Sequence, residues 1–406
     1  MNKPMNHRYW GYNTDYRDLL AQIALIGPQL EANAPADEAA GELTAASFAL
    51  LKPLRLSHLL VPEDLGGAQM RPTEILQVLE AVASHSGSAG WVSMVHCSIG
   101  GMSAAYLPDS AVSRLFGEGT ENRFSGQGAP LGMLKKVEGG YRLTGKWSYG
   151  SGFSHATWSH SAAFVDDGTG KPAKDEDGNP IIMCTHAPIS DHKQLGNWDV
   201  LGLKGTGSID YAAEDVFIAD DLVFPIIHAQ PQRLKELFSL GIVGLAAIGH
   251  TGWAMGAGRR MLDEISGFAR AKSGRAGMLG ESEKFWYDYG RAEASYRAAR
   301  AFVREVWSEI EAMCEAGQLM GTRQVSLVHL AKAQIHEVGV DLCNFAYRAA
   351  GGAGLRAGVI QRTFRDMMVA ANHFTIAPSI VTSVGRELGG QWSDRTWKFY
   401  DLVEQK

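Results

Sequence analysis

Residues 351–366 read GGAGLRAGVIQRTFRD. This stretch follows apolar residues at three- and four-residue steps, which predict a long helix that ends at the paired glycines Gly351 and Gly352. The apolar stripe consists of Val325, Val328, Ala331, Ile335, Val338, Leu342 and Phe345. Residues 352–357 also fit a GxGxxA pattern, but a helix and not a strand precedes them. They therefore do not indicate a fold that binds a nicotinamide dinucleotide.

Helical periodicity continues on both sides of this stretch. A second apolar stripe covers residues 285–313, and residues 240–271 and 367–388 have the same period. Four long helices are enough to build a bundle. We therefore predict a C-terminal four-helix bundle within residues 231–406.

The middle of the chain has a different pattern. Residues 123–230 contain short runs typical of strands, YRLTGKW, HSAAFV, PIIMCTH and SIDYAAEDVFI, separated by glycine-rich turns. Residues 166–180, DDGTGKPAKDEDGNP, predict an exposed loop between two strands. Residues 1–122 are again helical in period. The predicted fold class is α+β, in the order helical domain, β domain and helical bundle.

Composition limits the kinds of partner. With 38 basic and 44 acidic side chains the formal charge is −6, so no nucleic-acid or anionic membrane surface is indicated. No signal peptide or membrane span is predicted, and the cytoplasm is the expected compartment. The cysteines are scattered and predict neither a disulfide framework nor a metal site. They are Cys97, Cys184, Cys314 and Cys343.

Four local strings, in this order, resemble the acyl-CoA dehydrogenase superfamily across nearly the whole chain. They are residues 61–67 (VPEDLGG), 139–152 (GGYRLTGKWSYGSG), 201–218 (LGLKGTGSIDYAAEDVFI) and 351–366. The resemblance implies a barrel-like central β domain and a flavin held between that domain and the bundle. It also implies a homotetramer, or a dimer, in which a neighbouring subunit completes the cofactor site.

The dehydrogenases of this superfamily need a carboxylate that removes the α-proton of the substrate, since the flavin takes only the hydride. They place it shortly after the Arg-Asp pair, here Arg365 and Asp366, or early in the first bundle helix. Neither place holds an acid, and His373 lies at or one position before the first. A histidine there resembles the flavin-dependent monooxygenases of this fold, which hydroxylate phenols, indoles or related aromatics.

The expected function is therefore the oxygenase component of a two-component monooxygenase that hydroxylates a small aromatic through a flavin C4a-hydroperoxide. Because no nicotinamide motif is present, reduced FAD or FMN is expected from a separate flavin reductase, with O2 as co-substrate. The alternatives are a dehydrogenase or oxidase with a relocated base, a nitrogen- or sulfur-oxygenating enzyme, and a flavin-binding scaffold without turnover.

Three residues are predicted to carry the chemistry. Ser151 matches the position where the family places a hydroxyl beside flavin N5, and an acceptor there prolongs the life of the hydroperoxide. His373 is expected to manage a proton of the hydroperoxide or of the substrate, because the pKa of a histidine lies near working pH. His96 lies in the helix that faces the flavin pocket in this family. The alternative interpretations are that Ser151 is an ordinary turn residue and that His373 is a histidine of the core.

Further residues are predicted to bind the cofactor or the substrate. The flavin set is Tyr149, Ser151 and Gly152, with Arg270, Lys272, Arg275, Gly351, Gly352 and Gly354 for its phosphates. The aromatic pocket is predicted from Trp91, His96, Phe153, Trp198 and Phe374, with Tyr149 and Trp158 as further candidates.

Overall fold

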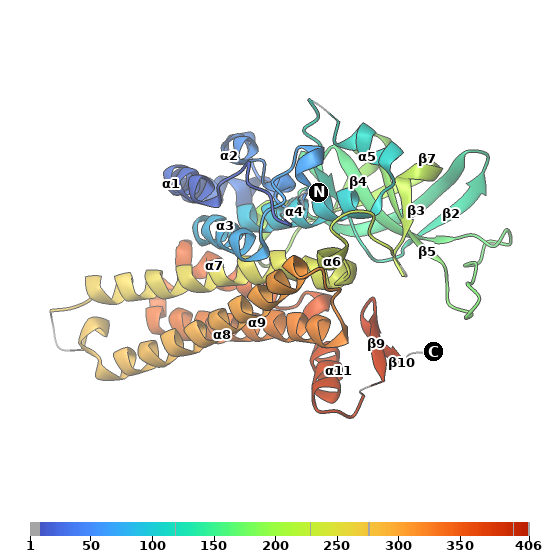
Figure 1. Ribbon diagram of the computed structural model, residues 1–406. Coiled ribbons are helices and arrows are strands. Elements are labelled where there is room, and N and C mark those ends of the chain that lie inside the picture. The colour runs from blue at the N-terminus through green and yellow to red at the C-terminus, as the bar shows by residue number, and fades with distance from the viewer. Residues whose placement is uncertain (1–8, 118, 228, 275–276, 393, 405–406) are drawn as a thin grey trace, which may run out of the picture.

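The computed structural model describes residues 9–117, 119–227, 229–274, 277–392 and 394–404. Helices come first in the chain, strands follow, and long helices return after them (Figure 1). The first group of helices is α1 (Tyr16–Ala40), α2 (Ala45–Leu51), α3 (Pro72–His85), α4 (Gly87–Tyr106) and α5 (Asp109–Leu115). The exact domain boundaries at 122/123 and 230/231 remain predictions.

Helix α4 is almost entirely buried, because its residues are small or apolar on every face. The hydroxyl of Ser86 caps its first turn by accepting from the N–H of Ala89 at 3.3 Å. Side chains at Gly100 and Gly101 would collide with Ser57 and Leu60, so these glycines let the preceding loop pack closely on the helix.

The strands form one eight-stranded sheet. They are β1 (Phe124–Ser125), β2 (Gly132–Val137), β3 (Gly140–Gly150), β4 (Trp158–Val165), β5 (Ile182–Pro188), β6 (Lys193–Gly196), β7 (Ile209–Ala219) and β8 (Val223–Pro225). The hydrogen-bonded order is β6-β7-β3-β2-β4-β5-β8, with β1 beside β4. This path is open at β6 and β8 among the described residues, so paired strands do not close it into the barrel that the resemblance implied. The exposed loop predicted at residues 166–180 connects β4 to β5 as expected.

The long helices are α7 (Gly241–Ala271), α8 (Glu283–Glu315) and α9 (Thr322–Ala350), preceded by the short α6 (Lys235–Phe238). The prediction of a single fourth helix over residues 367–388 is wrong. The chain forms α10 (Val359–Ala370) and α11 (Pro378–Leu388), with a 3-10 turn at Phe374–Ile376 and a bend of 77° between them. Pro378 has no N–H to continue a helix, and His373 is extended (ψ 134°). The bend aims residues 373–375 at the centre of the molecule.

The bundle predicted within residues 231–406 also contains two strands that were not predicted. Residues 395–404 contain an antiparallel hairpin, β9 (Arg395–Lys398) and β10 (Asp401–Glu404). The indole N–H of Trp397 donates to Ser326 Oγ at 2.9 Å and so anchors the hairpin to α9. Within the described residues no single helix is both long and apolar enough to cross a membrane, whereas the bent pair α10–α11 meets that test by length and composition only.

The Arg365–Asp366 pair joins the three parts of the chain. Asp366 is buried in α10, and its Oδ1 accepts from the backbone N–H of Leu203 at 2.5 Å. Arg365 donates to the carbonyl of Leu201 at 2.8 Å and forms an ion pair with Glu38 of α1 at 2.8 Å. Helix α10 is thus tied both to the β domain and to the first helices.

We expect Asp366→Ala to lower the free energy of unfolding by about 1–3 kcal/mol, because the buried N–H of Leu203 loses its acceptor. Asp366→Asn keeps a carbonyl oxygen in place and should cost less than about 1 kcal/mol. Urea unfolding of both variants at pH 7 measures the difference. Equal losses for the two variants would show that this hydrogen bond is not what joins the parts.

Candidate active site

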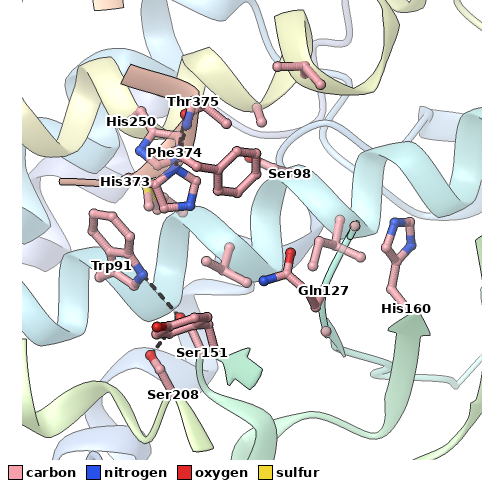
Figure 2. A pocket seen from close by; sticks show the side chains of 18 of the residues that line it. Trp91, Ser98, Gln127, Ser151, His160, Ser208, His250, His373, Phe374 and Thr375 are labelled. Atoms are coloured by element: carbon pink, nitrogen blue, oxygen red, sulfur yellow. Dashed lines mark hydrogen bonds between the residues drawn. The ribbon is translucent and has the colours of Figure 1, made fainter. Parts of the chain in front are cut away.

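A cavity of about 530 Å³ lies where α4, the β domain, α7 and the 369–375 segment meet (Figure 2). Its size is in the range of small-molecule sites. The described residues that line it include no Asp, Glu, Lys or Arg. They are Trp91, Met94, Val95, Ser98, Ile99, Met102, Gly126, Gln127, Gly128, Tyr149, Ser151, His160, Trp198, Leu203, Ser208, Ile242, Val243, Ala246, His250, Val369, Asn372, His373, Phe374, Thr375 and Tyr400.

Ser151 lies in a directed chain of hydrogen bonds (Figure 2). The hydroxyl of Thr206 donates to the carbonyl of Leu203 at 2.8 Å, so it accepts from Ser208 at 2.7 Å. Ser208 in turn accepts from the hydroxyl of Ser151 at 2.7 Å, and the Trp91 indole N–H donates to Ser151 Oγ at 3.1 Å. The Ser151 proton is therefore already engaged. Its oxygen retains one lone pair that can accept from a donor in the cavity.

The turn that presents Ser151 has an unusual backbone. Tyr149 and Gly152 both have positive φ, 65° and 68°, and a Cβ at Gly152 would come within 2.8 Å of His96 Nε2. Tyr149 is 64% exposed and lies edge-on to Trp198, with 6.3 Å between the ring centroids. Tyr149 and Trp198 both line the cavity.

His96, Phe153 and Trp158, all three named as candidates for the aromatic pocket, do not line the cavity. His96 Nε2 lies 3.2 Å from the carbonyl of Gly152, and burial lowers the pKa of His96 to about 3. The neutral ring therefore donates to this carbonyl and stabilises the turn that carries Ser151. Phe153 is fully buried in the β domain and stacks on Tyr211 at 4.1 Å. Trp91, Trp198 and Phe374 do line the cavity.

His373 lies above Trp91 in the same view (Figure 2). Its Nδ1 accepts from the backbone N–H of Thr375 and lies 2.9 Å from the Thr375 hydroxyl. The proton of the neutral ring is therefore on Nε2, which makes it a donor. Burial, with the charge of Lys332, lowers the pKa of His373 to about 3. The expectation that this residue titrates near working pH is wrong, because burial disfavours the imidazolium.

A buried basic cluster behind His373 was not predicted. The His250 ring lies 4.5 Å from that of His373 and 6.0 Å from that of His336. The Nζ of Lys332, which is fully buried, lies 3.4 Å from His329 Nδ1. His329, Lys332 and His336 are three and four residues apart on α9. This spacing places them on one face, and polar residues inside an otherwise apolar stripe were the signal that could have revealed them.

The residues predicted to bind phosphate lie elsewhere. Arg270 is 20 residues beyond the cavity-lining His250 on α7, which is about 30 Å along the helix axis. Lys272 follows it directly, Gly351, Gly352 and Gly354 follow the end of α9, and Arg275 is outside the described residues. None of the described ones lines the cavity of this chain.

A second histidine group borders the cavity at His160. His160 on β4 and Cys184 and His186 on β5 bring their ligand atoms within 4.8 Å of one another, which is a Cys/His cluster that sequence spacing did not indicate. The same contacts also fit a chain of hydrogen bonds in which each donor has an acceptor and no metal is needed. The thiol faces His160 Nε2 at 3.1 Å, His160 Nδ1 faces His186 Nε2 at 3.2 Å, and His186 Nδ1 faces the carbonyl of Leu222 at 3.2 Å.

Comparison with known proteins gives consistent matches. Residues 248–378 match the model of the acyl-CoA dehydrogenase C-terminal domain. Indole-3-acetate monooxygenase of Pseudomonas putida is 27% identical, covering 77% of this chain and 79% of its own. The FADH(2)-dependent resorcinol hydroxylase oxygenase component of Rhizobium sp. is 25% identical, covering 92% and 94%. The structure of XiaF from Streptomyces sp. in complex with FADH2 and glycerol superposes with a TM-score of 0.83 at 19% identity, covering 96% and 98%.

Burial lowers the pKa of Lys332 from 10.5 to about 7. Between these pH values the unfolded chain binds a proton at this side chain and the folded chain does not. The folded protein therefore loses stability as pH falls from 10.5 to 7. Lys332→Met should therefore be more stable than the wild type at pH 7, by up to about 5 kcal/mol, with a difference that shrinks toward pH 10. Urea unfolding at pH 7, 8.5 and 10 measures this.

The control is Lys284→Met, which removes an exposed lysine paired with Asp288 on α8. It should show no comparable change with pH. If the stability difference between Lys332→Met and the wild type is constant from pH 7 to pH 10, the claim that burial of the Lys332 ammonium lowers stability is wrong.

Proposed function

We infer that this chain, a member of the acyl-CoA dehydrogenase superfamily on the branch of the flavin-dependent monooxygenases, is the oxygenase component of a two-component enzyme that hydroxylates a small aromatic. One observation carries the inference. The hydroxyl of Ser151, held by its chain of hydrogen bonds, and the Nε2–H of His373 face a cavity whose described lining has no carboxylate. A dehydrogenase would need such a base at the substrate α-carbon, so this lining favours the oxygenase over the alternative.

The cavity residues fit a reduced flavin. Ser151 Oγ has a free lone pair, and a reduced isoalloxazine offers an N–H donor at N5. Trp91 fixes the orientation of the hydroxyl, because its indole N–H occupies the other acceptor position. Bound reduced flavin supplies the two electrons that reduce one oxygen atom of O2 to water while the other enters the substrate. The relatives named for FADH2 support the reduced form.

His373 would act as a hydrogen-bond donor and not as a base. Its Nε2–H is free to hold an oxygen atom in the cavity, while Thr375 keeps the ring in this tautomer. Phe374 and Tyr400, whose rings lie 4.8 Å apart, add aromatic surface for an aromatic substrate. Tyr149 and Trp198, whose rings lie edge to face, also line the cavity.

The phosphate-binding residues would serve a neighbouring subunit. Arg270 lies about 30 Å along α7 from His250, and neither Arg270, Lys272 nor the glycines after α9 line the cavity of their own chain. We therefore propose a homotetramer in which this end of the bundle reaches the cofactor of the next copy, with the separate reductase as the second functional partner. The reductase is needed because the chain has no nicotinamide motif.

The test is oxygenation with chemically or enzymatically reduced FAD or FMN, O2, and either resorcinol or indole-3-acetate, the aromatics named for the two relatives. We expect a hydroxylated product formed in proportion to reduced flavin, and none with oxidised flavin. Anaerobic oxidation of an acyl-CoA by the wild type would instead establish the dehydrogenase function.

Ser151→Ala should still bind flavin but release more hydrogen peroxide per reduced flavin consumed. One hydrogen bond contributes roughly 0.5–1.5 kcal/mol, so product yield against peroxide should shift by a few-fold to about tenfold. Peroxide and product are quantified in the same reaction. Ser113→Ala, on the exposed face of α5, is the control, and unchanged coupling in Ser151→Ala would remove the serine from the flavin site.

His373→Ala should slow oxygen transfer by about 10²–10³-fold, the usual cost of losing one donor to developing negative charge. His373→Gln retains an N–H donor and should recover part of the rate. Because burial lowers the pKa of His373 to about 3, the wild-type transfer rate should show no histidine titration between pH 5 and 8. Single-turnover product formation across that range measures both, and an inflection near pH 6.5 that disappears in His373→Gln would contradict the neutral donor.

A further inference from the structure

We propose that Lys332 makes the cavity selective for phenols that bind as phenolates, by placing a buried ammonium without a counter-ion behind the histidines that line it. This inference deepens the proposed function and depends on it, since it names the class of aromatic and the residue that selects it. Lys332 is a positioning residue in this account, because it lies outside the cavity lining and acts through its charge.

The starting observation is the missing counter-ion. Lys332 is fully buried in the middle of α9, and its nearest hydrogen-bonding neighbour is the neutral ring of His329 at 3.4 Å. Among the ion pairs of the described residues, none includes Lys332. A buried charge is expensive unless an opposite charge compensates it. The binding of an anion nearby would supply that compensation.

The groups around Lys332 do not supply it. His329 and His336 of α9, His250 of α7 and His373 of the 373–375 turn face this region, and burial lowers the pKa of each well below neutrality. All four rings are therefore uncharged. Burial lowers the pKa of Lys332 only to about 7, so Lys332 is the group of this cluster that is partly protonated at neutral pH.

The buried acids on the neighbouring helices are already engaged. Asp366 of α10 accepts from Leu203, and Glu311 of α8 accepts from the backbone N–H of Thr73 at 2.6 Å. Neither lies among the groups that shift the pKa of Lys332, for which burial is the cause. The cluster therefore keeps an unbalanced positive potential on the side of the cavity where His373 and His250 stand.

The charge of Lys332 lowers the pKa of His250 and of His373, and both histidines line the cavity. His336 Nδ1 donates to the carbonyl of Lys332 at 2.8 Å, its ring lies 6.0 Å from that of His250, and His250 lies 4.5 Å from His373, which lines the cavity. His250 Nδ1 and His336 Nε2 are buried without a hydrogen-bond partner in the described structure. The rings of His336, His250 and His373 thus form a polar but neutral group, and two of them line the cavity.

A phenol matches this arrangement. Its O–H bond breaks heterolytically, the proton goes to solvent, and the oxygen keeps the electron pair and accepts from His373 Nε2–H. The resulting phenolate and ammonium stabilise each other. The ionised oxygen also raises electron density in the ring, which favours oxygen transfer to it. Neutral aromatics without an ionisable group gain nothing from Lys332.

The test uses 4-nitrophenol, whose ionised form absorbs visible light, bound to the protein without flavin or turnover. Titrating pH against the absorbance of the bound probe gives its ionisation constant in the site. We expect this constant to be about tenfold larger in the wild type than in Lys332→Met, the effect of one charge acting over roughly 10 Å of protein. The affinity for 4-nitrophenol near neutral pH should fall by a similar factor in the variant.

Three comparisons make the outcome decisive. Lys284→Met should leave the ionisation of the probe unchanged, and the affinity for 4-nitroanisole, which cannot ionise, should be equal in wild type and Lys332→Met. A second neutral variant, Lys332→Gln, should reproduce Lys332→Met if the charge and not the methionine shape is responsible. Equal ionisation of bound 4-nitrophenol in wild type and both Lys332 variants would overturn the proposal.

The result also separates this proposal from the proposed function. If the wild type does not bind 4-nitrophenol, or binds it only in the protonated form, selection for phenolates is wrong. Hydroxylation of indole-3-acetate with reduced flavin would then still support the oxygenase. If no aromatic is hydroxylated with reduced flavin while bound 4-nitrophenol ionises as expected, the oxygenase function fails and the electrostatic assignment of Lys332 stands.

Discussion

The hydrogen bond from the Leu203 N–H to buried Asp366 is the contact on which the site depends. It fixes the turn of the β domain that carries Thr206 and Ser208 against the helix that leads to His373. Gly202 permits the approach, because a Cβ there would lie 2.2 Å from the carbonyl of Arg365. Arg365 extends the same junction to Glu38 of α1. The two walls of the cavity thus keep their spacing because two consecutive residues of α10 bind partners in different parts of the chain.

Burial sets the electrostatics of the cavity that this junction creates. Three histidines line it, and burial lowers the pKa of all three, His160, His250 and His373, so that each is neutral at physiological pH. The walls therefore offer donors and acceptors but no fixed charge, apart from the potential of Lys332 behind them. A site of this kind suits aromatic substrates and an uncharged donor that holds oxygen, and its described lining includes no carboxylate for the abstraction of an α-proton.

Much of the architecture was predictable from local pattern. The predicted extents of α7, α8 and α9 matched the structure closely. Helices α8 and α9 each bury one continuous face, which repeats every 3.6 residues, whereas residues 243–258 of α7 are buried on nearly every side. The strand-like runs and the exposed loop at residues 166–180 were likewise correct. Ser151 and His373, which the resemblance of short strings to the superfamily suggested, both line the cavity, and their roles stay predictions.

Other features depend on contacts that no local pattern contains. The break between α10 and α11, the terminal hairpin and the neutral state of His373 arise where one segment packs on another. Ser208 joins the site because it bonds to Ser151, 57 residues away, and His250 because α7 passes beside residue 373. Arg270 and the glycines after α9, which the sequence suggested for one cofactor site, do not line the cavity of their own chain. Periodicity follows from the geometry of a single helix or strand, whereas burial, pKa and the meeting of distant side chains are set only when the whole chain is packed.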